Sequence, residues 1–509
     1  MSRMGKLLTG LGGLFGLLAS LVTIVQFSEG RWSLAAPPPT VAATAAVAAQ
    51  PPAAPTLQPT VAPAIVTPTS PPPTTAPPTA PPATPAPSAA PPAAVVAVAS
   101  PTAQPAASPA APPAQAGPPT AIAAAGGQAS GQAVARIKIV SSLPRSGSNK
   151  AETDGVVNAV RQALDDTGGR AGGMAVVYED LNSASSGGDW DAAREAEIAA
   201  RAVADSEVML VIGGLDSSAA RVAIPILNRA NLAMIGLAST YPGLTKPGEG
   251  EPGEPDVYYP SGRRSFARIV PADDLQGAAG VRWARQLGAT KVYILEDGEL
   301  YGHGIAASFL EAAGPAGLQV VGGPERIDPK ARDYRAVATK VRGAGPELVY
   351  FGGLTKNNAG RLFKDLREVL GQNVRLMAAD GVYDQEFLDD AGDSAEGAYI
   401  TFPGVAPGKL AGRGAEWARA YGARFGSEPG TYAAYGYEAT RVALAAIDRA
   451  ARPDRAAVRD ALLATRDYDG VLGRWSFDQN GDTTLSTVSG RQVRRGRFDE
   501  ANAVVLNAR

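Results

Sequence analysis

The sequence has 509 residues, with 58 glycines, 43 prolines and no cysteine, and its formal net charge is −2. The lack of cysteine excludes disulfide scaffolds, thiolate catalysis and cysteine zinc sites. The near-neutral charge, without a basic excess, argues against nucleic acid as a partner.

The N-terminal segment 1–34 is expected to be a membrane anchor. Its uncharged run from Leu7 to Phe27, LLTGLGGLFGLLASLVTIVQF, could cross a hydrocarbon core of about 30 Å as a helix. Arg3 and Lys6 precede this run, so the positive-inside tendency places everything after it outside the cytoplasm. The alternative is a cleaved signal peptide, which would leave a secreted protein, although the apolar region of such a peptide is usually shorter.

Residues 35–135 are expected to form a disordered linker, or stalk. No Asp, Glu, Lys or Arg occurs between Arg31 and Arg136, and the segment consists almost entirely of Pro, Ala, Thr, Val, Ser and Gln. Such a composition offers too little large apolar surface to offset the entropy lost on folding, and its prolines favour extended polyproline geometry.

From Arg136 onward, short apolar runs alternate with helical patterns, which is typical of an α/β fold with a parallel sheet wrapped by helices. We expect strands at 136–143, 174–180, 208–214, 232–239, 291–297, 318–323, 348–353, 374–380 and 397–402. We expect helices at 154–169, 191–206, 217–228, 275–288, 303–317, 333–345 and 357–371. Two successive series of this kind indicate two doubly wound lobes.

Two of the expected strands end in small hydroxyl residues, in the stretches GGLDSS and GLAST. Ligands of parallel α/β sheets bind outside the carboxyl ends of the strands, so these hydroxyl residues are candidates for ligand contact. They are Ser217, Ser218, Ser239 and Thr240. Structural roles are the alternative, because Asp216 and Ser217 also suit a helix N-cap, and Ser239 and Thr240 also suit a turn.

Several motifs in a fixed order, among them STYPGLT, YGHG, AGDSAEG and FDQNGD, make residues 136–498 resemble the periplasmic leucine/isoleucine/valine-binding proteins of ABC transporters. The resemblance implies a type I periplasmic-binding-protein fold, in which two Rossmann-like lobes are joined by three crossovers and close on a ligand. The solute-binding domain would span 136–509. The expected lobes are 136–269 plus 404–478 for lobe 1, and 270–403 plus 479–509 for lobe 2.

The resemblance also implies a ligand site. It places the ligand carboxylate near Ser217, the Ser239 N–H group and the Thr240 hydroxyl. The ligand ammonium would meet the Ser239 carbonyl and Asp380, and Tyr301 would cover the ligand from the second lobe. Such groups match a zwitterion, which needs donors at one end and acceptors at the other once it leaves water. The alternatives are a simple turn at Asp380 and an ordinary surface position for Tyr301.

Two further polar residues are candidates for the cleft. Lys150 either reaches the ligand or is a solvated loop charge. His303, the only histidine, either touches the ligand or begins a helix at the cleft rim. No pattern in the sequence points to a metal-ligand set or to an organic cofactor.

Three departures from the family pattern concern the ligand. The loop after the first strand has no aromatic ring, Leu354 stands where relatives carry a tyrosine, and Lys246 to Phe266 form an insertion. These departures leave open a ligand that is larger or more acidic than a branched-chain amino acid.

The sequence therefore predicts an extracytoplasmic solute-binding protein that captures an amino acid or a similar small zwitterion, delivers it to an ABC permease and performs no chemistry. The first alternative is a ligand-binding sensor that signals through a partner protein. The second alternative is a hydrolase on the same fold that uses Ser217.

Overall fold

The computed structural model describes residues 135–186 and 188–507, all of which belong to the unit Ala121–Arg509. The expected membrane anchor and all but the last residue of the expected stalk lie outside the described residues. Within the described residues, none of the helices has both the length and the apolar composition needed to cross a bilayer.

The first lobe is built on a six-stranded sheet with the strand order β2-β3-β1-β4-β5-β6. Its strands are β1 (Arg136–Leu143), β2 (Arg170–Ala171), β3 (Met174–Asn182), β4 (Val208–Gly213), β5 (Ala233–Gly236) and β6 (Phe266–Arg268). Neighbouring strands run parallel, except that β2 is antiparallel to β3. Every residue of β4 is buried, which explains why its sequence is a continuous apolar run.

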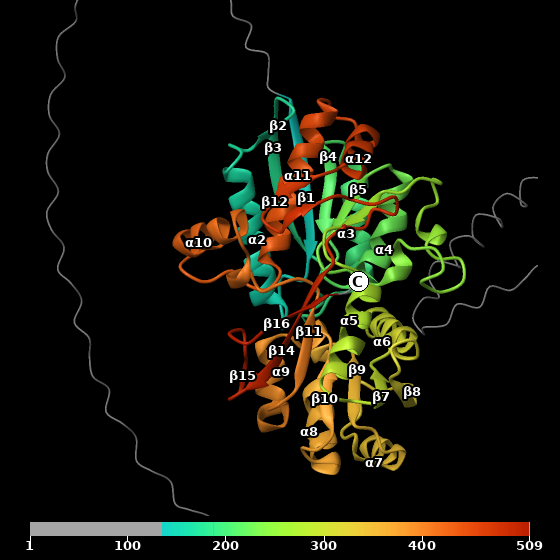
Figure 1. Cartoon of the computed structure of the whole chain (residues 1–509). Helices are drawn as coiled ribbons and strands as arrows, with labels where there is room; N and C mark the ends of the chain where they lie inside the picture. Colours follow the sequence, from blue (N-terminus) through green and yellow to red (C-terminus); the bar gives the residue numbers. More distant parts are fainter. Residues whose placement is uncertain (1–134, 187, 508–509) are drawn as a thin grey trace, which may run out of the picture. The chain divides into compact units, whose positions relative to one another are not determined.

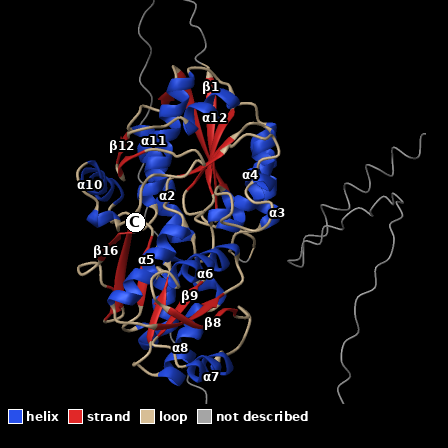
Figure 2. Ribbon diagram, turned by 45° about the vertical axis from the view of Figure 1, so that its right-hand side comes forward, coloured by secondary structure: helices blue, strands red, loops and turns tan. Residues whose placement is uncertain are grey.

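Helices cover both faces of the first sheet (Figure 2). They are α2 (Lys150–Asp165), α3 (Ala192–Ala204), α4 (Ser217–Arg229), α11 (Ala433–Ala450) and α12 (Arg455–Leu463). Helix α10 (Arg413–Phe425) packs on the outside of α2 and α11. One face packs against α2, α11 and α12, which contribute Val156, Val442 and Val458 to its core. The other face packs against α3 and α4 through residues such as Ala199 and Ile224. Figure 1 shows that α11 and α12, late in the chain, lie against the early strands.

The second lobe contains an eight-stranded sheet with the order β15-β14-β11-β10-β9-β7-β8, in which β16 also pairs with β14. Its strands are β7 (Lys291–Glu296), β8 (Gln319–Arg326), β9 (Leu348–Gly352), β10 (Arg375–Ala378), β11 (Tyr399–Phe402), β14 (Thr487–Arg494), β15 (Arg497–Phe498) and β16 (Val504–Asn507). Strands β7 to β11 are parallel, and β14 joins them in antiparallel pairing with β11. A separate hairpin joins β12 (Tyr468–Gly470) to β13 (Gly473–Trp475).

The second sheet is also covered on both faces. Its helices are α5 (Asp273–Gln286), α6 (Leu300–Ala313), α7 (Arg335–Ala344), α8 (Ala359–Leu370) and α9 (Gln385–Ala391). Helices α5 and α6 share one hydrophobic core with the sheet, and α7, α8 and α9 share the other. Helix α6 begins at Leu300, so His303 lies inside its first turns and does not begin the helix as expected from the sequence.

The chain passes between the two lobes three times, after β6, after β11 and after β13. The side chain of Arg268, which is fully buried, ties two of these passages together. Its guanidinium donates to Oδ1 of Asp482 at 2.8 Å and to the carbonyl oxygens of Ser239 and Tyr241 at 3.0 and 2.7 Å. The predicted α/β architecture of two doubly wound lobes is confirmed.

Candidate functional site

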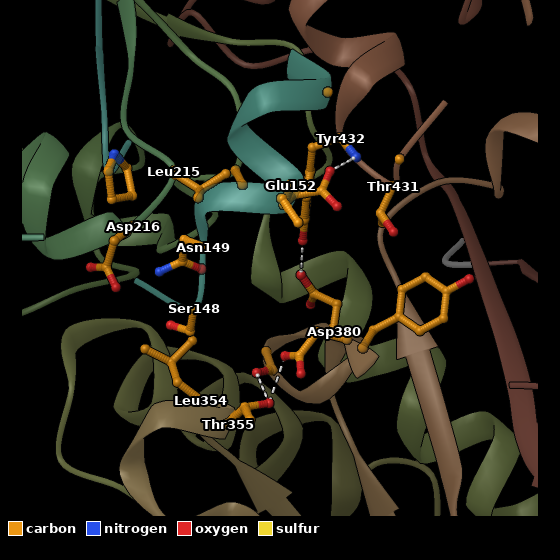
Figure 3. A pocket seen from close by; sticks show the side chains of 18 of the residues that line it. Ser148, Asn149, Glu152, Leu215, Asp216, Leu354, Thr355, Asp380, Thr431 and Tyr432 are labelled. Carbon is orange, nitrogen blue, oxygen red and sulfur yellow. Dashed lines mark hydrogen bonds between the residues drawn. The ribbon is translucent and has the colours of Figure 1, made fainter. Parts of the chain in front are cut away.

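A cavity of about 630 Å³ lies where the carboxyl ends of the two sheets face each other, and residues of both lobes line it (Figure 3). The first lobe contributes loops that follow β1, β3, β4 and β5, together with the start of α2. The second lobe contributes loops that follow β9 and β10, and the start of α6. This is the position at which doubly wound folds bind ligands, and the volume suits a small molecule.

Asp380 follows β10 and lies on the cavity wall. Its Oδ1 atom accepts hydrogen bonds from the Tyr301 hydroxyl at 2.9 Å and from Nε2 of Gln276 at 2.8 Å. Its Oδ2 atom accepts one from the Tyr432 hydroxyl at 2.5 Å. All three donors are uncharged, and a carboxylate offers about four acceptor positions. Three of these positions are occupied, so the side chain has an acceptor position left for a cationic group.

The two tyrosines that hold Asp380 are kept in the protonated form, which donates hydrogen bonds. Burial raises the pKa of Tyr301 and that of Tyr432 well above the usual value, and the negative charge of Asp380 raises both further. The Tyr301 hydroxyl in addition accepts the backbone N–H of Gly381 at 3.0 Å. The orientation of Asp380 is thus fixed by hydrogen bonds from both lobes.

Ser217 is the first residue of α4 and lies on the cavity wall of the first lobe. Asp216 caps this helix, as predicted, because its side chain accepts the N–H of Ser218 at 2.7 Å. The Ser217 hydroxyl oxygen accepts the N–H of Tyr241 at 3.2 Å, which leaves its own O–H group to donate. Together with the N-terminus of α4, this O–H group suits an anionic part of a ligand.

Ser239 and Thr240 do not line the cavity in this structure, and both are fully buried behind its wall. The Ser239 hydroxyl donates to the carbonyl oxygen of Gly214 at 2.6 Å. The Thr240 carbonyl oxygen accepts the N–H of Asp273 at 3.0 Å. The two residues therefore support the wall, and direct ligand contact by either one stays a prediction.

The other three candidates also lie away from the cavity wall. The Ser218 hydroxyl donates to Oε2 of Glu299 at 3.1 Å, which joins the two lobes. Lys150 is exposed and pairs at 2.5 Å with Asp154, which does line the cavity. His303 is about half exposed, and its Nε2 atom lies 3.7 Å from Oε1 of Glu251 in the insertion.

Several cavity residues were not predicted. Trp190, in the loop after β3, provides an aromatic wall, and Nζ of Lys356 lies 5.8 Å from its ring centroid. Glu152 accepts the N–H of Tyr432 at 2.6 Å, and both residues line the cavity. Trp190 directly precedes the helix expected at 191–206, in the loop that follows the expected strand 174–180, and its place in such a loop could have identified it. Leu354, which stands where relatives carry a tyrosine, also lines the cavity.

Two doubly wound lobes, three connections and a cavity at facing carboxyl ends define a two-lobed binding fold. Comparison with known families gives the same result, because the model of the family described as periplasmic binding protein matches residues 136–497. The chain belongs to this family, whose members bind solutes and are not enzymes.

Individual relatives agree with this assignment. An amino acid binding protein of Pseudomonas aeruginosa is 30% identical over 292 residues, which is 57% of this chain and 72% of the relative. A leucine-, isoleucine-, valine-, threonine- and alanine-binding protein of the same organism is 27% identical over 290 residues, again 57% and 72%. The crystal structure of a leucine-binding protein from Thermotoga maritima has a TM-score of 0.63 at 25% identity, and the match covers 73% of this chain and 99% of that one.

Proposed function

We propose that the chain captures an amino acid, or a similar solute with an ammonium group, and delivers it to the permease of an ABC transporter. The observation that carries this proposal is the Asp380 carboxylate, which faces the cavity and is held by uncharged donors alone. A charged carboxylate in such a place is stabilised further by a cationic ligand group. The names of the two Pseudomonas relatives support an amino acid as the ligand.

In this proposal the ligand ammonium contacts Asp380, and the ligand carboxylate contacts Ser217 and the N-terminus of α4. Hydrogen bonds between the lobes, from Tyr432 to Asp380 and from Ser218 to Glu299, hold the lobes together around the ligand. Ligand binding then favours the closed arrangement over an open one, and the permease recognises the closed arrangement.

We further propose that the binding domain, residues 136–509, works outside the cytoplasm at the end of a tether. Residues 1–34 would provide the membrane anchor, and residues 35–135 the stalk. The uncharged run Leu7 to Phe27 and the charge-free Pro/Ala/Thr segment after it support this arrangement. Cell fractionation of the full chain and of a chain without residues 1–34 tests this arrangement. We expect only the full chain in the membrane fraction. A full chain that keeps residues 1–34 and is found outside the membrane fraction would overturn the proposal.

A thermal-shift screen of the full chain against the twenty amino acids tests the binding function. A ligand at about 100 times its dissociation constant adds about 2.7 kcal/mol of stability, which is a measurable shift. We expect a shift with at least one amino acid and no shift with the corresponding N-acetylated compound, which lacks the ammonium group. A screen in which no amino acid shifts the melting temperature would overturn the proposal.

A further inference from the structure

The charges on the cavity wall are strongly one-sided. A single lysine, Lys356, lines the cavity. Seven carboxylate residues line it, and they are Glu152, Asp154, Asp216, Asp380, Asp384, Glu386 and Glu428. They come from both lobes, so closing the lobes brings negative charges toward one another.

Only one of these seven carboxylates is paired with positive charge. Asp154 forms ion pairs with Arg145 at 2.8 Å and with Lys150 at 2.5 Å. Among the residues that the structure describes, no ion pair is formed by the other six. Lys356 lies against the ring of Trp190. The cavity wall therefore carries an excess of acidic side chains, which a cationic ligand can offset.

Acidic side chains of the two lobes lie near one another at the cavity and beside it. Burial raises the pKa of Glu152, and the charge of Asp384 on the opposite lobe adds to this effect, against hydrogen bonds from the first lobe. Burial also raises the pKa of Glu299, and Asp216 on the opposite lobe raises it further. Such repulsion opposes closure unless a positive group stands between the carboxylates.

Tyr432 sets the spacing between two of the carboxylates. Its backbone N–H donates to Glu152 and its hydroxyl donates to Asp380, so the two acidic groups lie at opposite ends of one tyrosine residue (Figure 3). The α-ammonium group and the terminal cationic group of lysine or arginine are separated by a comparable length. One basic amino acid can therefore reach both carboxylates.

We propose that the ligand is a basic amino acid, whose α-ammonium group binds Asp380 and whose side-chain ammonium or guanidinium group binds Glu152. This inference rests on the proposed function and adds the ligand class. Aromatic side chains of the wall, Trp190 and Tyr432 among them, pack against the aliphatic stem or the cation of such a ligand. A more acidic ligand, which the sequence left open, does not fit a cavity with this charge.

Lysine and norleucine provide the sharpest test, because they have the same chain length and differ in the terminal ammonium group. We expect calorimetry on the full chain to show at least tenfold tighter binding of lysine or arginine than of norleucine, and no binding of glutamate. Tighter binding of norleucine or leucine would overturn the ligand class and keep the proposed function. Absence of binding by every amino acid would overturn both.

The Glu152→Gln variant tests the residue assignment. Glutamine keeps an acceptor for the N–H of Tyr432 and removes the charge, so we expect at least a tenfold loss of lysine affinity with norleucine affinity unchanged. Glu416→Gln, an exposed change on α10 away from the cavity, is the matched control. Equal losses for lysine and norleucine, or no loss for either, would overturn the assignment. The lysine and norleucine comparison on the unmodified chain remains decisive if the variant does not fold.

Discussion

The hydroxyl oxygen of Tyr432 in the first lobe lies 2.5 Å from Oδ2 of Asp380 in the second lobe. This hydrogen bond joins the lobes at the cavity itself. Tyr432 immediately precedes α11, whose residues belong to the core of the first lobe, and Asp380 follows the central strand β10 of the second. The contact thus connects two rigid bodies through one donor and one acceptor.

Removal of that donor is expected to weaken ligand binding. In Tyr432→Phe the ring remains and the bond to Asp380 is lost, so the closed arrangement loses about 1.5 to 3 kcal/mol, the usual contribution of a hydrogen bond to a charged group. We expect ligand affinity, measured by calorimetry, to fall by about tenfold or more. Tyr437→Phe is the control, because its hydroxyl bonds the carboxylate of Asp166 within the first lobe and does not line the cavity. Equal affinities of Tyr432→Phe and the unmodified chain would contradict the prediction.

Neutralising Asp380 is expected to have a larger effect. Asp380→Asn keeps the shape of the side chain and removes the charge that the ligand ammonium would meet. Losing one partner of a buried charged pair costs about 2 to 5 kcal/mol, so amino acid affinity should fall by about 30-fold or more. Asp389→Asn, an exposed change on α9, serves as control. Retention of amino acid binding by Asp380→Asn would refute the role of this carboxylate.

The buried Glu195 on α3 predicts a pH dependence of stability. Its Oε2 atom accepts the Ser142 hydroxyl at 2.7 Å, and burial, aided by the charge of Asp216, raises its pKa from 4.5 to about 7. The folded state therefore favours the protonated form. The resulting stabilisation of the folded state is fully present below pH 4.5 and is lost as the pH rises through 7. The free energy of unfolding falls by on the order of 3 kcal/mol over this range.

Urea unfolding at pH 5 and pH 8 checks this sign. Glu195→Gln cannot ionise at this position. The free energy of unfolding of the variant, relative to that of the unmodified chain, should therefore be higher at pH 8 than at pH 5. Glu197→Gln, an exposed change on the same helix, should show no such gain. A constant difference between Glu195→Gln and the unmodified chain at both pH values would refute the assignment.

Gly214, at the end of β4, is expected to tolerate no side chain. Its φ angle is +67°, and a Cβ atom there would lie 2.3 Å from the Ser239 hydroxyl oxygen. Gly168 has a similar φ of +65° and no atom within 4 Å of a built Cβ. Gly168→Ala therefore measures backbone strain alone, about 1 kcal/mol, and Gly214→Ala should lower the free energy of unfolding by distinctly more. Equal losses of unfolding free energy in the two variants would contradict the prediction, because they would show that the neighbouring residues can move to accept a side chain at Gly214.

The sequence predicted β1, β3 to β5 and β7 to β11, most of which are buried and read as apolar runs. It missed the short strands β2 and β6 and all strands after β11, which are short or antiparallel and show no such run. It also placed Ser217 and Asp380 at strand ends, where the cavity lies. It could not distinguish these two residues, which line the cavity, from Ser239 and Thr240, which do not. The rule that ligands bind at the carboxyl ends of strands does not say which of two adjacent loops reaches the cavity. Glu152 was missed because its partner, Tyr432, is 280 residues away.

The covering of the first sheet by α11 and α12 delays the completion of the first lobe. Strands β7 to β11 leave the ribosome as an unbroken run, with the helices that cover them between the strands. On the first sheet, α2 alone covers part of one apolar face until α11 and then α12, which ends at Leu463, have been synthesised. The second sheet in turn receives β14 and β16 only after α12, so both lobes depend on residues made after β11, and their open faces need protection from aggregation during that interval.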